Sequence, residues 1–408
     1  MKHLLSLTAL ALALAPLSAL AQGADPNGQP APVVGQAPAP GAPAAVTPDK
    51  ASAPAEEAPK PLMWRGTSFT WTQNASTSLL GIGTDQVGFE EDVYAWDFIL
   101  SPQIYLLDLE KDKILAFAEG GVSVEWTDSG STTTKHEPAF RDTQVGVGYN
   151  RNIFKSEDNE WSTDARVRLR YNIPTSKISL EQGRYGVLSP GVSLSQQFKL
   201  LGQAAKGLNS LTLTAGFTWS HLFAKSYTPT NPNLQRTRQS VSGTTREDDQ
   251  LSFRSMDIDR LIPSATIGLP IYGGLELTAV YRLIGRFKHD FESGACEIVV
   301  MGECQTADRD PNRVNYVTDS SFDISLSQPI YDMFTLNLGY NNESLTLDEA
   351  SKLRNPFWSP GGSVFYLDLV ANIDVIYDKA SGRSKIDLPP GPNQNATAAS
   401  NAFGMPSF

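Results

Sequence analysis

Several patterns and residue types are scarce in this sequence, and each shortage excludes a class of protein. After the N-terminal stretch there is no run of about eighteen apolar residues, which excludes a membrane-spanning helix. Two cysteines and four histidines are too few for a zinc site, which needs several such ligands close together. The net charge of −11 argues against nucleic acid as a partner. We expect neither a metal nor a cofactor.

The N-terminal part of the chain has the features of an exported protein. Lys2 precedes the apolar run Leu4–Leu14, and Ala19-Leu20-Ala21 supplies small residues for cleavage. This pattern predicts a signal peptide over residues 1–21, too short to remain as a membrane span. Residues 22–62 are rich in Pro, Ala, Gly and Gln without periodicity, which predicts a disordered linker. The linker is either a passive spacer or a tether that touches cell wall or a partner.

The two cysteines, Cys296 and Cys304, lie close together in a polar segment. In an exported protein an even number of cysteines favours a disulfide over free thiols. We therefore predict a Cys296–Cys304 bridge that closes one short loop.

The segment Trp161–Ile173 decides the kind of secondary structure. Its even positions include Arg166, Arg168 and Arg170, while Val167 and Leu169 occupy odd positions between them. Side chains of a strand alternate between two faces, so the segment predicts a strand with one apolar and one polar face. A helix would scatter the three arginines around its axis. A strand of a soluble sheet could alternate in the same way. Whether the pattern recurs along the whole chain, and with what spacing, distinguishes a soluble sheet from other β architectures.

The alternation recurs in about a dozen segments between Trp64 and Tyr377. The predicted strands are Arg65–Gln73, Val93–Leu107, Ile114–Trp126, Phe140–Ile153, Trp161–Ile173, Val187–Phe198, Ser210–Phe223, Leu261–Ile271, Leu275–Lys288, Phe322–Ile330, Phe334–Asn341 and Val364–Tyr377. Short turns alternate with long polar loops between them, the longest loops being Lys225–Arg260 and Asp290–Ser321. A soluble sandwich has no reason to keep all its short turns at one end, whereas a membrane barrel does so.

These features together resemble a bacterial outer-membrane β-barrel of porin- or transporter-like architecture. Aromatic residues near strand ends fit the same resemblance: Trp126, Trp161, Trp219, Tyr331 and Tyr377. We predict an all-β protein, with an antiparallel up-and-down transmembrane barrel of about 12 strands over residues 63–377. Residues 378–408 are predicted to form a disordered periplasmic tail, and residues 22–62 a periplasmic linker. The resemblance is to an architecture and not to a motif, so it says little about the solute.

The polar faces of the predicted strands carry charges that are candidates for lining the lumen. The basic candidates are Arg166, Arg168, Arg170, Arg282, Arg286 and Lys288, and the acidic candidates are Asp97, Glu119, Glu125, Asp142, Asp323, Asp368 and Asp374. A basic wall concentrates anionic or zwitterionic solutes, which predicts a passive channel for small polar solutes. The alternative is an occluded structural or adhesive barrel, in which Arg166 and Arg168 pair with Asp142 and Glu119.

An outer-membrane enzyme is a further alternative that the histidines disfavour. Outer-membrane phospholipases and lipid A deacylases resemble one another in placing a Ser two residues after the catalytic His. Here Pro138, Phe223 and Phe291 occupy those positions. We therefore expect that the protein is not an enzyme. Catalytic residues brought together from separate loops are the alternative that the sequence does not exclude. The expected location is the outer membrane, with its lipid and lipopolysaccharide as partners beside the small polar solute.

Overall fold

The computed structural model describes the chain from residue 61 to residue 382 with gaps. The described residues are 61–82, 93–127, 136, 138–156, 161–199, 210–225, 235–239, 245–249, 255–271, 274–290, 298–300, 303–305, 315–347, 351–359 and 363–382. The predicted signal peptide, nearly all of the linker, the tail beyond Gly382 and Cys296 lie outside these residues. The signal peptide, the linker, the tail and the disulfide therefore stay predictions.

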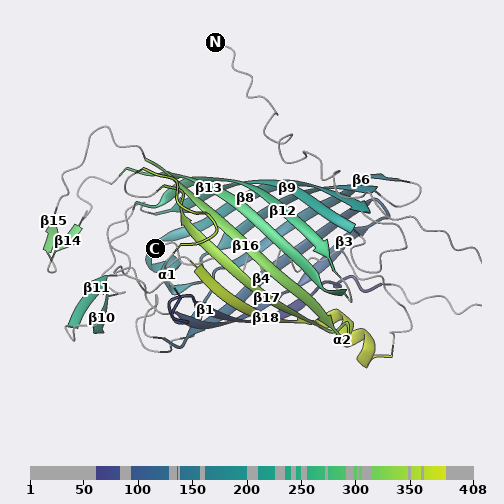
Figure 1. The fold of residues 1–408 in the computed structure, drawn as a ribbon, viewed down its shortest axis with the longest axis horizontal. Coiled ribbons are helices and arrows are strands. Elements are labelled where there is room, and N and C mark those ends of the chain that lie inside the picture. Colours follow the sequence, from purple (N-terminus) through teal and green to yellow (C-terminus); the bar gives the residue numbers. More distant parts are fainter. Residues whose placement is uncertain are drawn as a thin grey trace, which may run out of the picture. The chain divides into compact units, whose positions relative to one another are not determined.

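Nearly all described elements belong to one antiparallel sheet (Figure 1). Its strands are β1 (Ser68–Ser76), β2 (Tyr94–Ser101), β3 (Gln103–Asp108), β4 (Asp112–Glu125), β5 (Pro138–Phe140), β6 (Thr143–Lys155), β7 (Trp161–Ile173), β8 (Arg184–Lys199), β9 (Ser210–Ala224), β12 (Asp257–Pro270), β13 (Glu276–Lys288), β16 (Tyr316–Ile330), β17 (Phe334–Leu345) and β18 (Ser363–Asn372). Two separate hairpins are formed by β10 (Gln235–Gln239) with β11 (Thr245–Asp249), and by β14 (Ile298–Val300) with β15 (Glu303–Gln305).

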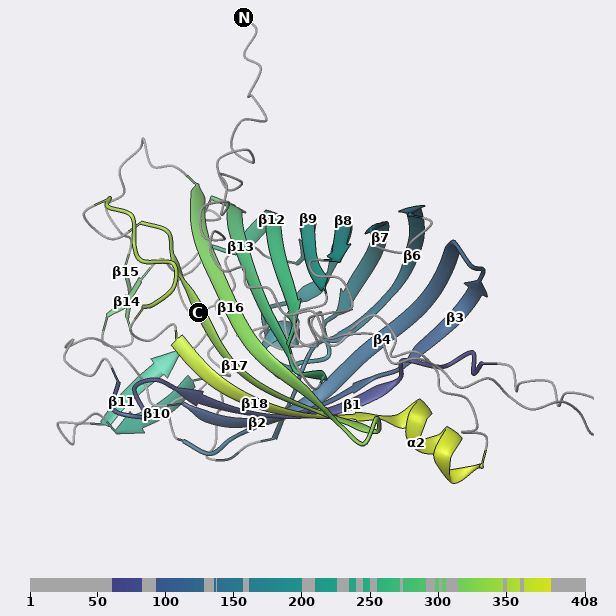
Figure 2. The same ribbon diagram turned by 45° about the vertical axis from the view of Figure 1, so that its right-hand side comes forward.

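The sheet closes on itself as a barrel of twelve strands. β2 and β3 are two halves of one strand, interrupted at Pro102, and both pair with β4. β5 is a short addition that pairs only with β4. Closure comes from β1, which pairs with β18 on one side and β2 on the other. No barrel strand is thus left with an unpaired edge, as spanning a bilayer requires. The predicted fold class is confirmed (Figure 2).

The alternation of side chains sorts the barrel into an apolar outside and a polar inside. Val167 and Leu169 on β7 are 49% and 45% exposed. Arg166, Arg168 and Arg170, which alternate with them, are half-buried on the inward face. The same inward face continues around the sheet with buried Thr, Ser, Asn and Asp side chains. An apolar outer surface over a polar interior is the arrangement expected of a membrane barrel.

Exposed aromatic side chains stand near the ends of the strands, as the sequence predicted. Trp161 begins β7 and Trp126 directly follows β4; they are 53% and 42% exposed. Trp219 in β9 and Tyr331 after β16 are exposed as well. Such residues form the interfacial girdles of membrane barrels.

Large rings on the barrel wall lie over glycines of neighbouring strands. A Cβ atom at Gly146 would collide with the Phe117 ring, and one at Gly339 with the Tyr366 ring. Both glycines are needed for this close approach, because any larger residue would displace the ring. These rings cover the inner wall, so part of the barrel interior is filled by side chains.

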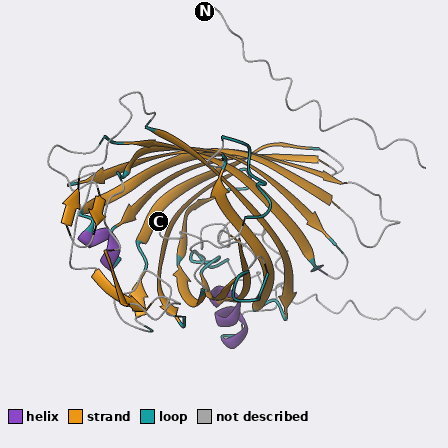
Figure 3. Ribbon diagram, turned by 60° about the vertical axis from the view of Figure 1, so that its left-hand side comes forward, coloured by secondary structure: helices purple, strands orange, loops and turns teal. Residues whose placement is uncertain are grey.

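Short and long connections alternate as predicted (Figure 3). One end carries the tight connections, such as residues 109–111 between β3 and β4 and residues 331–333 between β16 and β17. The long connections hold β5, helix α1 (Lys177–Glu181) and the two hairpins. By the predicted orientation the long connections face outward from the cell, and we refer to that end as the extracellular end.

The first predicted strand begins later than the sequence suggested. Met63–Gly66 form a turn that continues along β3, where the Tyr105 amide donates to the Met63 carbonyl at 2.7 Å. Arg65 in this turn pairs with Asp108 and lies 4.0 Å above the Tyr105 ring centre. The segment before β1 is thus fixed to the short-turn end of the barrel.

The last strand was predicted to reach Tyr377, and this prediction was wrong at its C-terminal end. β18 stops at Asn372, and helix α2 (Ile373–Ala380) follows, so Asp374 lies in a helix and not on an inward strand face. The residues Ile373, Ile376, Tyr377 and Ala380 also fit helical spacing, which the alternation of Ile373, Val375 and Tyr377 concealed. The Asp374 carboxylate accepts from the Gly66 amide at 2.8 Å, and the Tyr377 ring contacts Trp64.

Candidate functional site in the barrel lumen

The candidate site begins with the arginine strip, which consists of Arg166, Arg168 and Arg170 on the inward face of β7. The Arg166 Nε donates to the Asn150 side-chain oxygen at 2.7 Å, and Arg170 donates to the Gln144 side-chain oxygen at 3.2 Å. Arg168 lies 5.5 Å from the centre of the Phe117 ring.

The partners of Arg166 and Arg168 are neutral, in contrast to the predicted alternative of ion pairs with Asp142 and Glu119. Within the described residues, neither Arg166 nor Arg168 forms an ion pair. Glu119 is close enough for charge–charge interaction with Arg168 and Arg170. The strip therefore presents a concentration of positive charge to the lumen, with one carboxylate nearby.

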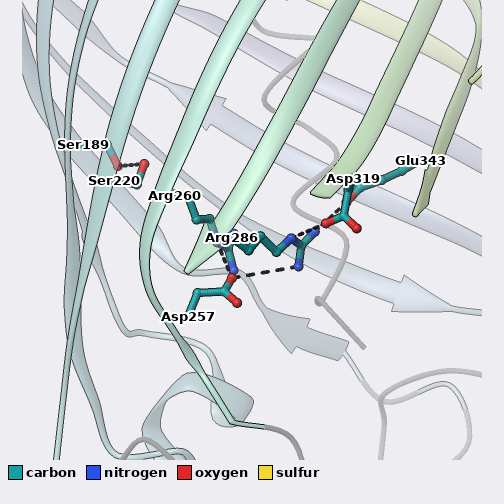
Figure 4. Close-up of polar contacts among 7 residues, drawn as sticks. All are labelled: Ser189, Ser220, Asp257, Arg260, Arg286, Asp319 and Glu343. Carbon is teal, nitrogen blue, oxygen red and sulfur yellow. Dashed lines mark hydrogen bonds and ion pairs between the residues drawn. The ribbon is translucent and has the colours of Figure 1, made fainter. Parts of the chain in front are cut away.

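The wall beside the arginine strip is lined by small, uncharged side chains. This hydroxyl wall is formed by inward residues of β8, β9 and β12: Ser189, Gly191, Ser193, Ser195, Thr212, Thr214, Gly216, Thr218, Ser220, Ser264 and Thr266. Ser189 and Ser220 share a hydrogen bond of 2.8 Å (Figure 4). Ser195 and Thr214 share one of 2.7 Å. Because these side chains are short, this stretch of wall takes little room in the lumen.

Strand β13 carries the other predicted cations. At the extracellular end, Arg286 pairs with Asp319 and with Glu343 at 3.0 Å (Figure 4). Asp257 approaches Arg286 at 4.0 Å and also accepts from Arg260 at 2.6 Å.

This network places three carboxylates around Arg286, so here the ion-pair alternative describes the structure. Further along the lumen, Arg282 has Asp323 and Glu343 within electrostatic range but forms no ion pair in the described part of the chain. Lys288 lies on the same inward face as Arg286 and is the register partner of Asp257. The two predicted basic strands thus differ: Arg286 of β13 forms ion pairs, whereas Arg166 and Arg168 of β7 form none with the described residues.

Opposite the hydroxyl wall lies an acid–amide wall formed by β16, β17, β18, β1 and β2. Each acid has an amide beside it: Asn74 donates to Asp97 at 2.7 Å, Asn341 to Asp323 at 3.4 Å, and Asn337 to Asp368 at 3.4 Å. All six side chains are buried. Tyr366 also donates to Asp323, at 3.1 Å. Negative charge is therefore held on the side of the lumen away from the arginine strip.

The remaining predicted acids lie toward the extracellular end. Glu125 is buried at the end of β4 and accepts from the Thr127 hydroxyl at 3.2 Å. Asp142 lies just before β6. The predicted alternative, in which Asp142 pairs with Arg166 or Arg168, was wrong. Its carboxylate accepts instead from the Ser176 amide at 2.9 Å and from the Ser179 hydroxyl, which holds the start of α1. The alternation of side chains in a strand gives no sign that a helix in a loop, here α1, will bind the carboxylate of Asp142.

Several residues of the lumen were missed by the sequence argument. Asp319 and Glu343 were assigned to loops because β16 and β17 were predicted too short. The sequence did contain a signal for Asp319, because it lies four residues before Asp323 and an even spacing places both side chains on the same face of a strand. Tyr366 and the three amides gave no signal, because alternation assigns a face to a side chain and not a partner.

Neither helix of the described residues is long and apolar enough to span a bilayer. The same residues contain no group of three or more His, Cys, Asp or Glu side chains that could hold a metal ion.

Comparisons with known proteins place the chain by architecture alone. No family model matches it, and no curated protein does. Among solved structures it is similar to an outer-membrane channel from Pseudomonas putida F1, at 9% identity and a TM-score of 0.43, over 78% of this chain and 98% of that chain.

Two further solved structures show the same level of likeness. The NanC porin is matched at 12% identity and a TM-score of 0.32, over 75% of this chain and 98% of that one. LpxR from Salmonella typhimurium is matched at 10% identity and a TM-score of 0.32, over 74% and 99%. At these values the likenesses describe a shared barrel architecture and carry no argument about function.

Proposed function

We propose that this chain is an outer-membrane channel through which small polar solutes, anionic or zwitterionic, diffuse passively. The observation that carries the proposal is the arginine strip, in which Arg166 donates to the Asn150 side chain and Arg168 lies against the Phe117 ring. A cation that is held by neutral groups keeps its field available to a passing solute. A guanidinium also matches the planar, forked geometry of carboxylate and phosphate groups.

The distribution of charge across the lumen supports a preference for dipolar solutes. Positive charge lies on β7, and the acid–amide wall with Asp323, Asp368 and Asp97 lies on the other side. A solute that carries both charges would be oriented between these two walls. The hydroxyl wall between them offers hydrogen bonds without adding charge.

The apolar outer surface supports a location in the outer membrane, with outer-membrane lipid and lipopolysaccharide as partners. Exposed side chains such as Val167, Leu169, Val192 and Phe217 face away from the lumen. Leaving such a surface in water is unfavourable, and a lipid environment removes that cost. Recovery of the expressed protein in the outer-membrane fraction, with gel mobility that changes on heating, would test the location.

Single-channel recording tests the channel proposal directly. The full chain, refolded and inserted in planar bilayers, should give discrete conductance steps. Under a salt gradient the reversal potential should lie on the anion-selective side, because the arginine strip attracts anions. Insertion without any conductance would overturn the proposal.

An occluded barrel is the second candidate, and the Arg286 network favours it. Asp319 and Asp257 are buried at the extracellular end, where both pair with the half-buried Arg286 and occupy lumen space. In that case the same recordings would give inserted protein without steps. No observation on the described residues favours an enzyme, and the predicted absence of catalysis stays a prediction.

A further inference from the structure

The hydroxyl wall has arginines along both of its edges. Strands β7, β8, β9, β12 and β13 follow one another in the barrel wall (Figure 2). One row of inward residues crosses all five strands, in the order Arg166, Ser193, Gly216, Ser264 and Arg282. All five are half-buried, so each keeps part of its surface open to the lumen.

A second row repeats this arrangement nearer the extracellular end. Arg170 on β7 is the register partner of Ser189, and Arg260 on β12 is the register partner of Ser220. The two serines are joined by their hydrogen bond. Arginine side chains are much longer than those of serine and glycine, so guanidinium groups can extend over this low wall from both edges.

Two glycines keep the middle of the wall low. A Cβ atom at Gly216 would lie 2.7 Å from the Ser264 hydroxyl, and one at Gly191 would lie 2.9 Å from the Thr218 hydroxyl. A side chain at either position would therefore displace a neighbouring hydroxyl. The space above the wall is thus left to the arginines and to whatever passes through the lumen.

Arg170 and Arg282 come from opposite edges of the wall, and their charges lie within electrostatic range of each other. Like charges repel more strongly in a protein interior than in water. Arg282 forms neither a hydrogen bond nor an ion pair with any residue that the structure describes. An anion between the two arginines would remove their repulsion.

The acids nearest to these arginines already have other partners. Glu119 has the charges of three arginines around it. Asp323 accepts a hydrogen bond from Tyr366 at 3.1 Å, and Glu343 pairs with Arg286 at 3.0 Å. The space above the hydroxyl wall is therefore bordered by positive charge that the nearby carboxylates share with other groups.

The donors around this space suit an oxyanion better than a halide. A guanidinium presents parallel N–H groups that match two oxygens of one carboxylate or phosphate. The hydroxyl groups of Ser193 and Ser264 form no hydrogen bond within the described part of the chain, so they can donate to a further oxygen. A halide ion has no pair of oxygens for the guanidinium fork to bind.

We propose that Arg170 and Arg282, with the hydroxyl wall between them, form a binding site for the carboxylate or phosphate group of a solute. This oxyanion site rests on the proposed channel function and adds the place where an anionic group is held. It also adds a second strand, β13, to the arginine strip of β7. The lumen then selects oxyanions over chloride, beyond a general attraction of anions.

Block of the chloride current in planar bilayers tests the site. The full chain is recorded in KCl, and potassium phosphate or potassium acetate is added, with extra KCl of equal ionic strength as the control. Either oxyanion should reduce the chloride conductance in a saturable manner. Block by phosphate alone, by acetate alone or by both supports the site and tells which group it holds.

Three variants assign the block to the two arginines. Arg170→Gln and Arg282→Gln each remove one charged donor, which should raise the half-blocking concentration about tenfold or more. Arg282→Lys keeps the charge without the fork and should fall between Arg282→Gln and the parent. Arg151→Gln, on the outer face, is the control and should leave the block unchanged. Heat-dependent gel mobility checks that each variant is folded.

The contrary outcomes separate this site from the channel itself. A parent that conducts but is blocked by neither oxyanion overturns the site and leaves the channel, as does a block that survives in Arg282→Gln. A parent that inserts without conducting overturns the channel. Thermal unfolding in detergent then decides about the site: stabilisation by phosphate or acetate beyond KCl, lost in Arg282→Gln, supports it, and no stabilisation overturns it.

Discussion

The ring of Tyr366 on β18 lies over Gly339, its register partner on β17. The same side chain donates its hydroxyl to Asp323 on β16 at 3.1 Å. One tyrosine therefore spans three neighbouring strands of the inner wall, and it does so only because position 339 has no side chain.

We expect Gly339→Ala to destabilise the barrel. A methyl group at this position would occupy the place of the Tyr366 ring, push the ring off the wall and break its hydrogen bond to Asp323. Forcing an extra carbon into a filled interior typically costs about 1–3 kcal/mol. Denaturant titration of the refolded protein would measure the loss.

Gly120→Ala is the matched control for this prediction. An added Cβ there would meet only the Thr143 side chain, at 3.5 and 3.9 Å, which is ordinary contact distance. Equal losses at both positions would show that Tyr366 does not need the space above Gly339.

The membrane-facing surface gives a second prediction, in which two arginine substitutions should differ. Leu169 is 45% exposed on the outer face of β7, whereas Thr212 points inward on β9. Arginine in place of a lipid-facing residue near the bilayer centre costs about 2–4 kcal/mol. Leu169→Arg should therefore lower the free energy of unfolding in lipid far more than Thr212→Arg. Equal tolerance of the two changes would contradict a lipid-facing β7.

The Arg286 network gives a third prediction. Arg286→Met leaves Asp319, Glu343 and Asp257 together without their shared cation. Removing one side of a buried ion pair typically costs about 3–5 kcal/mol. Unfolding titrations should show a loss of this size. Arg168→Met, which removes a contact with the Phe117 ring and no ion pair, should cost much less. A small loss for Arg286→Met would mean that water already screens the network.

The barrel could be predicted from the sequence because its main signal is local. β7 covers the same residues as its predicted segment, Trp161–Ile173, since apolar and charged residues alternate there without interruption. The prediction of secondary structure failed where the apolar residues fit both the spacing of a strand and the spacing of a helix. Ile373–Tyr377 fits both a strand and a helix, and the tertiary contacts of Asp374 with Gly66 accompany the helix.

The site was only partly predictable because it depends on which strands become neighbours. Alternation placed Arg168 and Asp323 on the polar face correctly, yet it could not show that Arg168 lies over a ring or that Asp323 is held by Tyr366. The pairing of β1 with β18, which brings Thr72 beside Asp368, joins the first barrel strand to the last. Two segments so far apart in sequence give no local sign of each other.

The arginine strip gives the last prediction, which separates an open lumen from an occluded one. Replacing Arg166, Arg168 and Arg170 with Gln removes three charges but breaks no ion pair of Arg166 or Arg168 in the described residues. Stability should therefore change little. Anion preference in planar bilayers should fall, most clearly at low salt, where the screening length reaches about 30 Å at 0.01 M.

Arg151→Gln is the control for the strip, because Arg151 lies on β6 with its side chain 58% exposed and odd parity places it on the outer face. It should leave the reversal potential unchanged, so that a change in the triple variant is due to charge inside the lumen. If the triple variant instead unfolds readily and the parent never conducts, the arginines hold a filled interior together through Glu119 and Gln144. The lumen of this barrel would then be a structural core, and the channel proposal would be wrong while the fold stands.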